Sequence, residues 1–157
     1  MTRELVRTHL SHKPITELRD RRKDLYPERK PVGFWYNVDG DWEGWVRDRG
    51  IYAPNARRYR VELKPRTLLR IRTHAGIQQF FRRYKAPGCG PAMSIIAGGI
   101  DWPRVAERWA GIEIAPYLGM GEHHEWLQWY YGWDVASGCV WDPPAAGVTF
   151  TEISDDA

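Results

Sequence analysis

Short runs of alternating apolar and polar residues recur along the chain and predict a sheet of several strands. Alternation with a period of two places the apolar side chains on one face of a strand. Residues that favour turns, mainly glycine, proline and aspartate, separate most of the runs. The predicted strands are Leu5–Leu10, Val32–Asn37, Tyr59–Leu63, Thr67–Arg72, Ile112–Ala115, Gly138–Trp141 and, as an edge strand, Val148–Ile153.

Apolar residues spaced three and four positions apart predict the helices. The clearest pattern covers residues 77–84, which follow Thr73, a residue type that caps helix N-termini well. Three further helices are predicted: a basic helix that opens at Ile15 and ends at Pro27, a short helix at Asp41–Arg49, and one that Asp101 caps and that ends at Gly111. Residues 86–99 and 119–125 are expected to form loops, because they are rich in glycine, proline or polar residues.

The order of these elements indicates the fold class. Strands and helices mix through short connections, without the regular alternation that builds a parallel sheet. We therefore expect an α+β fold with a small, mainly antiparallel sheet, whole or split, and three to four helices. A chain of 157 residues is expected to form one globular domain, with residues 154–157 as a tail.

Tryptophan is the unusual feature of the composition. The chain has nine tryptophans, and residues 126–141, where a turn or short helix is expected before the late strand, are especially rich in them. Large aromatic rings bury much area and fix one packing geometry. This segment is therefore interpreted either as the centre of the core or as the floor of a binding site.

Charge and cysteine content narrow the class of protein. The net charge is only +3, but residues 19–30, 57–60 and 82–85 are rich in arginine and lysine. Such segments attract phosphate or nucleic acid, or form a solvated surface with interleaved acids. The two cysteines are too few for a disulfide framework and fit reduced thiols. Because there is no apolar signal region and no run near the roughly 20 residues that span a bilayer, we expect a cytoplasmic protein without a membrane partner.

Motif searches leave two minor alternatives open. The sequence has no Walker phosphate loop, no Rossmann glycine pattern, no nucleophile elbow and no His-Glu-x-x-His helix. His123 and His124 are adjacent, and adjacent side chains point apart on a helix. They could bind a metal only in an extended loop with ligands from elsewhere, and no metal is expected. A glycoside hydrolase would pair two carboxylates beside tryptophan, and Asp134, Glu113 and Glu125 are the available acids.

Five segments, taken in chain order, carry a resemblance to a known family. They are Arg7-Thr8-His9, Phe34-Trp35-Tyr36-Asn37, the strand and helix from Leu68 to Tyr84, Trp109-Ala110-Gly111-Ile112, and Cys139-Val140-Trp141-Asp142-Pro143. Their order resembles the ADP-ribosyltransferase-like fold of small bacterial and phage toxins and effectors. The resemblance implies that NAD is bound and that its ADP-ribosyl group is transferred to a protein or nucleic acid, in the host cytoplasm if the protein is phage-encoded.

The resemblance also implies roles for individual residues. In the family a His or Arg on the first strand holds the NAD ribose, which implies His9 or, as second choice, Arg7. A Tyr or Ser on the second strand clamps the nicotinamide, which implies Tyr36, with Trp35 as an aromatic wall.

The late strand departs from the family pattern. A Glu at the start of this strand orients the ribose and the acceptor in the family, but this chain has Ser137 at that place. Asp134, three residues earlier, is the nearest acid and the candidate catalytic carboxylate, together with Tyr36. The run Trp129–Asp134 is also similar to one in small phage proteins, which fits the alternative of a non-catalytic accessory module that binds a protein or nucleic acid through an aromatic and basic face.

Overall fold

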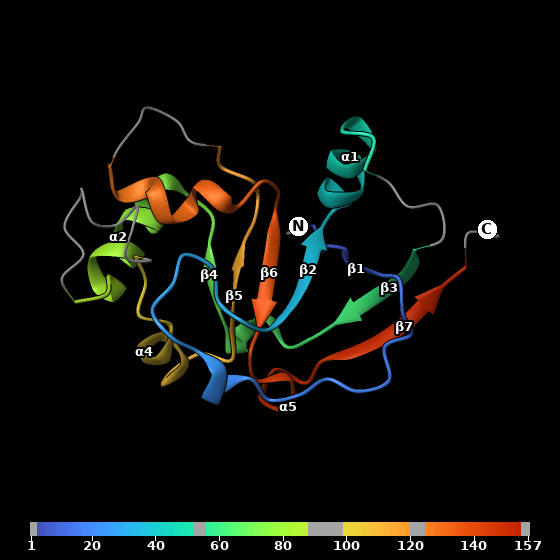
Figure 1. Cartoon of the computed structure of the whole chain (residues 1–157), viewed down its shortest axis with the longest axis horizontal. Coiled ribbons are helices and arrows are strands. Elements are labelled where there is room, and N and C mark those ends of the chain that lie inside the picture. The colour runs from blue at the N-terminus through green and yellow to red at the C-terminus, as the bar shows by residue number, and fades with distance from the viewer. Residues whose placement is uncertain (1–2, 52–55, 88–98, 120–124, 155–157) are drawn as a thin grey trace.

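The protein is built on one seven-stranded sheet (Figure 1). The computed structural model describes residues 3–51, 56–87, 99–119 and 125–154. The strands are β1 (Arg7–Ser11), β2 (Phe34–Val38), β3 (Arg57–Glu62), β4 (Leu68–Ile71), β5 (Gly111–Ile114), β6 (Ser137–Val140) and β7 (Thr149–Ile153). Their order is β4-β5-β6-β2-β1-β3-β7, in which only β4 and β5 pair in parallel. The expected α+β class and mainly antiparallel sheet are confirmed, and the sheet is larger than the small one expected.

Short helices connect and cover the strands. The described part of the chain has four α-helices, α1 (Asp41–Asp48), α2 (His74–Tyr84), α4 (Trp102–Ala106) and α5 (Pro143–Ala146), and three 3-10 helices, η1 (Arg22–Asp24), η2 (Pro65–Thr67) and η3 (Glu125–Gly132). The predicted caps are confirmed. The Thr73 hydroxyl accepts a hydrogen bond from the Gly76 amide at 3.0 Å, and the Asp101 carboxylate accepts one from the Arg104 amide at 3.3 Å.

The predicted basic helix from Ile15 to Pro27 is wrong. Apart from the single turn η1, the backbone of this segment bonds to distant parts of the chain. The Ile15 amide donates to the Tyr59 hydroxyl at 3.2 Å, and the Arg21 amide donates to the Trp141 carbonyl at 2.7 Å. At these two positions a tertiary partner takes the place of a helical hydrogen bond.

The main core lies on one face of the β4-β5-β6 half of the sheet. Helices α2, α4 and η3 gather at this half in Figure 1, and their apolar residues pack with those of β5 and β6. Four tryptophans are fully buried there, Trp102, Trp129, Trp133 and Trp141. Most of the aromatic segment is therefore core, as one of the two interpretations proposed.

The sheet is weakly joined between β1 and β2. These strands pair at only two positions, Arg7 with Val38 and Thr8 with Asn37, whereas β1 pairs with β3 at four. In Figure 1, β3 and β7 run obliquely to β5 and β6. Beyond Thr8 the two strands separate, and the His9 ring spans the opening, with Nδ1 at 2.5 Å from the Trp35 carbonyl oxygen. This opening positions the site described next.

Candidate functional site

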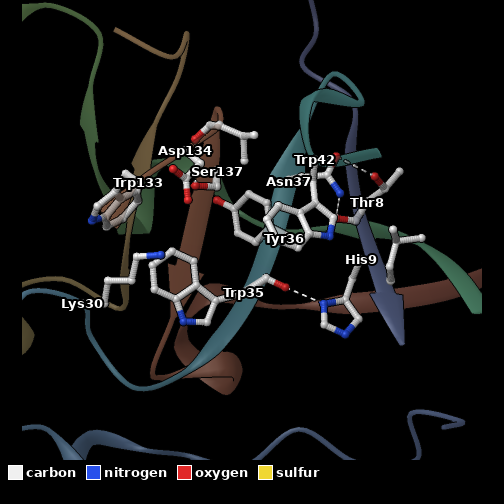
Figure 2. A pocket seen from close by; sticks show the side chains of 12 residues that line it. Thr8, His9, Lys30, Trp35, Tyr36, Asn37, Trp42, Trp133, Asp134 and Ser137 are labelled. Carbon is white, nitrogen blue, oxygen red and sulfur yellow. Dashed lines mark hydrogen bonds between the residues drawn. The ribbon is translucent and has the colours of Figure 1, made fainter. Parts of the chain in front are cut away.

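A pocket of about 360 Å³ lies where β1 and β2 separate, between α1 and the chain that follows η3 (Figure 2). Its volume is at the lower end of the range of small-molecule sites, about 300–1,000 Å³. The lining residues come from β1, β2, β6, α1 and two connecting segments. They are Thr8, His9, Leu10, Lys30, Trp35, Tyr36, Asn37, Trp42, Trp133, Asp134, Val135 and Ser137.

Trp35 and Trp42 form the walls of the pocket, and the buried Trp133 supports Trp35 from behind. The rings of Trp35 and Trp133 meet edge to face, with centroids 4.9 Å apart. Trp42, on α1, lies on the other side of the pocket from Trp133 in Figure 2, and its ring stacks on Trp45 with a centroid distance of 5.0 Å. Because these contacts fix the rings from outside, the walls are preformed and suit a flat, ring-shaped ligand.

The floor of the pocket is a polar row across three neighbouring strands. Thr8 on β1 pairs with Asn37 on β2, which pairs with Ser137 on β6, so the three side chains share one face of the sheet. The Thr8 hydroxyl lies 3.0 Å from Asn37 Oδ1, and Asn37 Nδ2 donates to the Thr8 carbonyl at 3.0 Å. The Ser137 hydroxyl donates to the Val135 carbonyl at 3.1 Å. All three side chains are buried, and the Thr8 hydroxyl also lies 3.1 Å from Glu43 Oε1, so the row is a preorganised polar surface beneath the pocket.

One acidic and one basic side chain, Asp134 and Lys30, lie at the rim of the pocket. Among the described lining residues Asp134 carries the only carboxylate, and it is exposed. The Lys30 ammonium lies 5.4 Å from the centre of the Trp35 ring. Partial burial lowers the pKa of Lys30, while the charge of Asp134 acts in the opposite direction. A ligand in the pocket therefore meets an acid and a base at its entrance.

His9 presents a hydrogen-bond acceptor in its neutral form. Burial lowers the pKa of His9, although the bond to the Trp35 carbonyl acts against this. Since a carbonyl oxygen only accepts, Nδ1 must carry the proton, and Nε2 of the neutral ring is an acceptor. Such a nitrogen can bind a sugar hydroxyl, the role that the family resemblance implies for this residue.

The lowered pKa of His9 predicts a pH dependence of stability. Because the folded protein disfavours the charged ring, the unfolded chain binds more protons in the pH interval from the ordinary value of 6.5 down to the lowered pKa. The free energy of unfolding is therefore expected to fall as the pH drops through this interval. Denaturant unfolding of His9→Asn, which keeps a donor near the Nδ1 position, should lose this part of the slope. His12→Asn, at an exposed position, is the control, and an unchanged slope in His9→Asn would contradict the assignment.

A buried ionic network lies on the opposite face of the sheet. Glu113 on β5 accepts hydrogen bonds from Arg7 Nε at 2.6 Å and Nη2 at 3.1 Å, from the Tyr36 hydroxyl at 2.8 Å and from Arg70 Nε at 3.2 Å. Arg7, Tyr36 and Glu113 are all buried. The Tyr36 ring reaches Glu113 by crossing Gly138, where an added Cβ would lie 2.3 Å from the tyrosine hydroxyl. The network ties β1, β2, β4 and β5 together beneath the pocket.

The electrostatics of Glu113 argue against the glycoside hydrolase alternative. Burial alone would raise the pKa of this carboxyl, but the hydrogen bonds and charges of Arg7, Tyr36 and Arg70 hold it below its usual value. A general acid needs the reverse, a raised pKa. Glu113 is thus a structural carboxylate, and it lies across the sheet from the face that carries the polar row.

Comparisons with known proteins did not identify a relative of this chain, since protein-family models, curated proteins and solved structures gave no match. Within the described ranges, no cluster of three His, Cys, Asp or Glu side chains is placed to hold a metal ion, and no helix is long and apolar enough to cross a membrane. The predictions for Cys89, His123 and His124 lie outside the described residues, while Cys139 is a buried free thiol.

The structure brings most of the predicted site residues together. His9, Trp35, Tyr36, Asp134 and Ser137 all line the pocket. The Tyr36 hydroxyl, however, is bonded to Glu113.

Arg7 is the exception among the predicted residues, because it is not among those that line the pocket and its guanidinium is bound to Glu113. Sequence reasoning missed Thr8, Lys30, Asn37 and Trp42. The signal for Trp42 was present, since it precedes Trp45 by three residues on a short helix, but this spacing was interpreted only as a packing face.

Proposed function

We propose that the protein binds NAD through its nicotinamide ribose half in this pocket and transfers the ADP-ribosyl group to a protein or nucleic acid. One observation carries the proposal: the strands to which the family resemblance assigns roles, β1, β2 and β6, lie side by side and contribute His9, Trp35, Tyr36 and Ser137 to one pocket. An ADP-ribosyltransferase-like fold is part of the same proposal.

The dimensions and chemistry of the pocket suit one half of the dinucleotide. The tryptophan walls suit a flat ring, and the polar floor suits a sugar. A volume of about 360 Å³ holds a ring and a ribose rather than a whole dinucleotide. The adenosine half would therefore lie outside the pocket, along the surface beyond the rim.

The proposed reaction requires little covalent chemistry from the protein. The bond from ribose C1′ to the ring nitrogen breaks, and its electron pair returns to the ring, which leaves as neutral nicotinamide. A lone pair of the acceptor forms the new bond to C1′, and the acceptor's proton passes to Asp134 or to water. The Asp134 carboxylate stabilises the positive charge that develops on the ribose.

Calorimetric titration with NAD tests the binding part of the proposal. We expect micromolar to millimolar affinity, weakened about tenfold by Trp42→Ala because one stacking surface is removed. Tyr26→Ala removes an exposed aromatic residue away from the lining and should leave the affinity unchanged. Tyr36→Ala is unsuitable, since it also breaks the buried network. No heat with either NAD or ADP-ribose, on folded protein, would overturn the proposal.

Release of labelled nicotinamide tests the catalytic part. Asp134→Asn is expected to lower the turnover of NAD by about 10²–10⁴-fold, the usual contribution of a positioned acid or base, with little change in NAD affinity. Asp24→Asn, on η1 and outside the pocket lining, is the matched control. Equal turnover in Asp134→Asn and the parent protein would remove Asp134 from the mechanism.

A non-catalytic binding module is the second candidate, and a specific observation favours it. The late strand has Ser137 where the family has Glu, and Glu113 is fully engaged by two arginines and Tyr36. A module of this kind would bind a protein or nucleic acid without consuming NAD. Salt-dependent binding of single-stranded RNA or DNA, or capture of a protein partner, with no turnover of labelled NAD, identifies it.

Ion pairs reduce the free positive charge that this alternative needs for nucleic acid. Arg57 bonds Glu152 at 2.9 Å, and Arg58 bonds Glu43 at 2.9 Å. Arg22 lies 2.6 Å from Asp20 and 3.3 Å from Asp142. These three arginines of the basic segments are thus paired with acids within the fold, which lowers the positive charge that they offer to nucleic acid.

A further inference from the structure

One of the side chains that line the pocket, Lys30, is itself a cation. The Lys30 side chain crosses Gly132, where an added Cβ would lie 3.2 Å from Lys30 Cε, and its ammonium sits over the Trp35 ring at 5.4 Å. Trp133 supports the Trp35 ring from the side, and the Asp134 carboxylate lines the same pocket. An ammonium over an indole face with a carboxylate nearby is the arrangement by which proteins bind organic cations.

We propose that the pocket selects a positively charged flat ring, and that Lys30 is an internal competitor that such a ring displaces from Trp35. The inference rests on the proposed function for the identity of the ligand, a pyridinium ring as in oxidised NAD. Its consequence is a preference for NAD over NADH, because the reduced ring has the same outline but carries no charge.

Charge decides because the area buried against the walls does not discriminate between the two rings. Neutral and cationic rings of equal outline stack on tryptophan with similar buried area, so the area term cancels in the comparison. The cation gains in addition from the indole faces and from the Asp134 carboxylate. Lys30 is the opposing element, because its ammonium repels the incoming charge and occupies the same ring face.

The test uses two small probes that contain no phosphate or ribose. 1-Methylnicotinamide is a cation, and nicotinamide is a neutral ring of nearly the same shape. Calorimetry should show at least about fivefold tighter binding of 1-methylnicotinamide, as one cation–π contact of about 1 kcal/mol predicts. Lys30→Ala should tighten the binding of 1-methylnicotinamide several-fold, whereas Lys30→Arg, which keeps the charge, should not.

Lys13→Ala removes an exposed lysine outside the pocket lining and controls for the change in net charge. Equal affinities for the two probes, or weaker binding of 1-methylnicotinamide by Lys30→Ala, would overturn the inference. The experiment distinguishes failure of this inference from failure of the proposed function. If the cationic probe binds as expected but NAD does not bind, the pocket is a cation site and the NAD proposal is wrong. If NAD binds and the two probes do not differ, charge selection is wrong and the NAD proposal stands.

Discussion

A Glu113→Ala protein is expected to unfold with a free energy about 3–5 kcal/mol smaller than that of the parent protein. The substitution leaves the Arg7 guanidinium buried beside the Tyr36 hydroxyl without the carboxylate that now binds both. A buried charge that loses its counter-ion retains its full desolvation cost, which is why the loss is large. Urea or guanidinium denaturation, followed by tryptophan fluorescence, measures it.

Two further variants separate the effect of burial on the unfolding free energy from the effect of charge. Glu152→Ala removes a carboxylate from an exposed pair with Arg57 and should change the unfolding free energy by less than about 1 kcal/mol. Glu113→Gln keeps the shape but not the charge, and an intermediate loss is expected because its amide can still accept a hydrogen bond. Equal effects of Glu113→Ala and Glu152→Ala would show that the network does not hold the sheet together.

Gly138→Ala is expected to destabilise the protein by about 3 kcal/mol, although alanine suits a strand better than glycine. The added Cβ would lie 2.3 Å from both Cζ and the hydroxyl oxygen of Tyr36. The tyrosine must therefore leave the position from which it donates to Glu113. The substitution then costs free energy twice, through overpacking and through the loss of a buried hydrogen bond. Denaturant unfolding again measures the change.

The control for this prediction has the opposite sign. Gly44 lies inside α1, and an added Cβ there meets no atom within 4 Å. Gly44→Ala should stabilise the protein by about 0.5–1 kcal/mol through helix propensity. In a Tyr36→Leu background the cost of Gly138→Ala should shrink, since the ring that causes the clash is gone. An unchanged cost in that background would show that the tyrosine is not the obstacle.

The strands were predictable because local alternation and turn residues determine them. The start of β5 could not be predicted from local patterns. Gly111 was expected to end a helix, yet it begins β5. Glycine is needed there because an added Cβ would lie 2.5 Å from the Cys139 carbonyl oxygen on the neighbouring strand. That requirement comes from Cys139, far along the sequence, and no local pattern contains it. The wrong helix at Ile15–Pro27 has the same origin in distant backbone partners.

The site was predictable at the level of strands and less so at the level of side chains. The family resemblance indicated β1, β2 and the start of β6, and these do surround the pocket. The alternation of side chains along each strand then decides which face of the sheet a side chain lies on. Tyr36 directs its hydroxyl to Glu113, while Trp35 and Asn37 belong to the pocket face. Trp42 and Lys30 reach the pocket from segments that only the tertiary fold brings near.

The division between the two faces gives the protein a rigid base for its pocket. Arg7 and Tyr36 fix β1 and β2 to Glu113 on one face, while the next residues along these strands, Thr8 and Asn37, form the polar row on the other. Arg7 and Glu113, which are not among the lining residues, therefore position the floor of the pocket from the opposite face.

The most direct test of the proposed NAD site is an NMR titration that follows the tryptophan indole N–H signals. Addition of NAD should shift the signals of Trp35, Trp42 and Trp133, which line the pocket. The signals of Trp102 and Trp141 should stay in place, because these indoles donate to the Glu28 and Trp109 carbonyls away from the pocket lining. Unmoved signals for all three pocket tryptophans at saturating NAD, or shifts confined to Trp102 and Trp141, would contradict the proposed site.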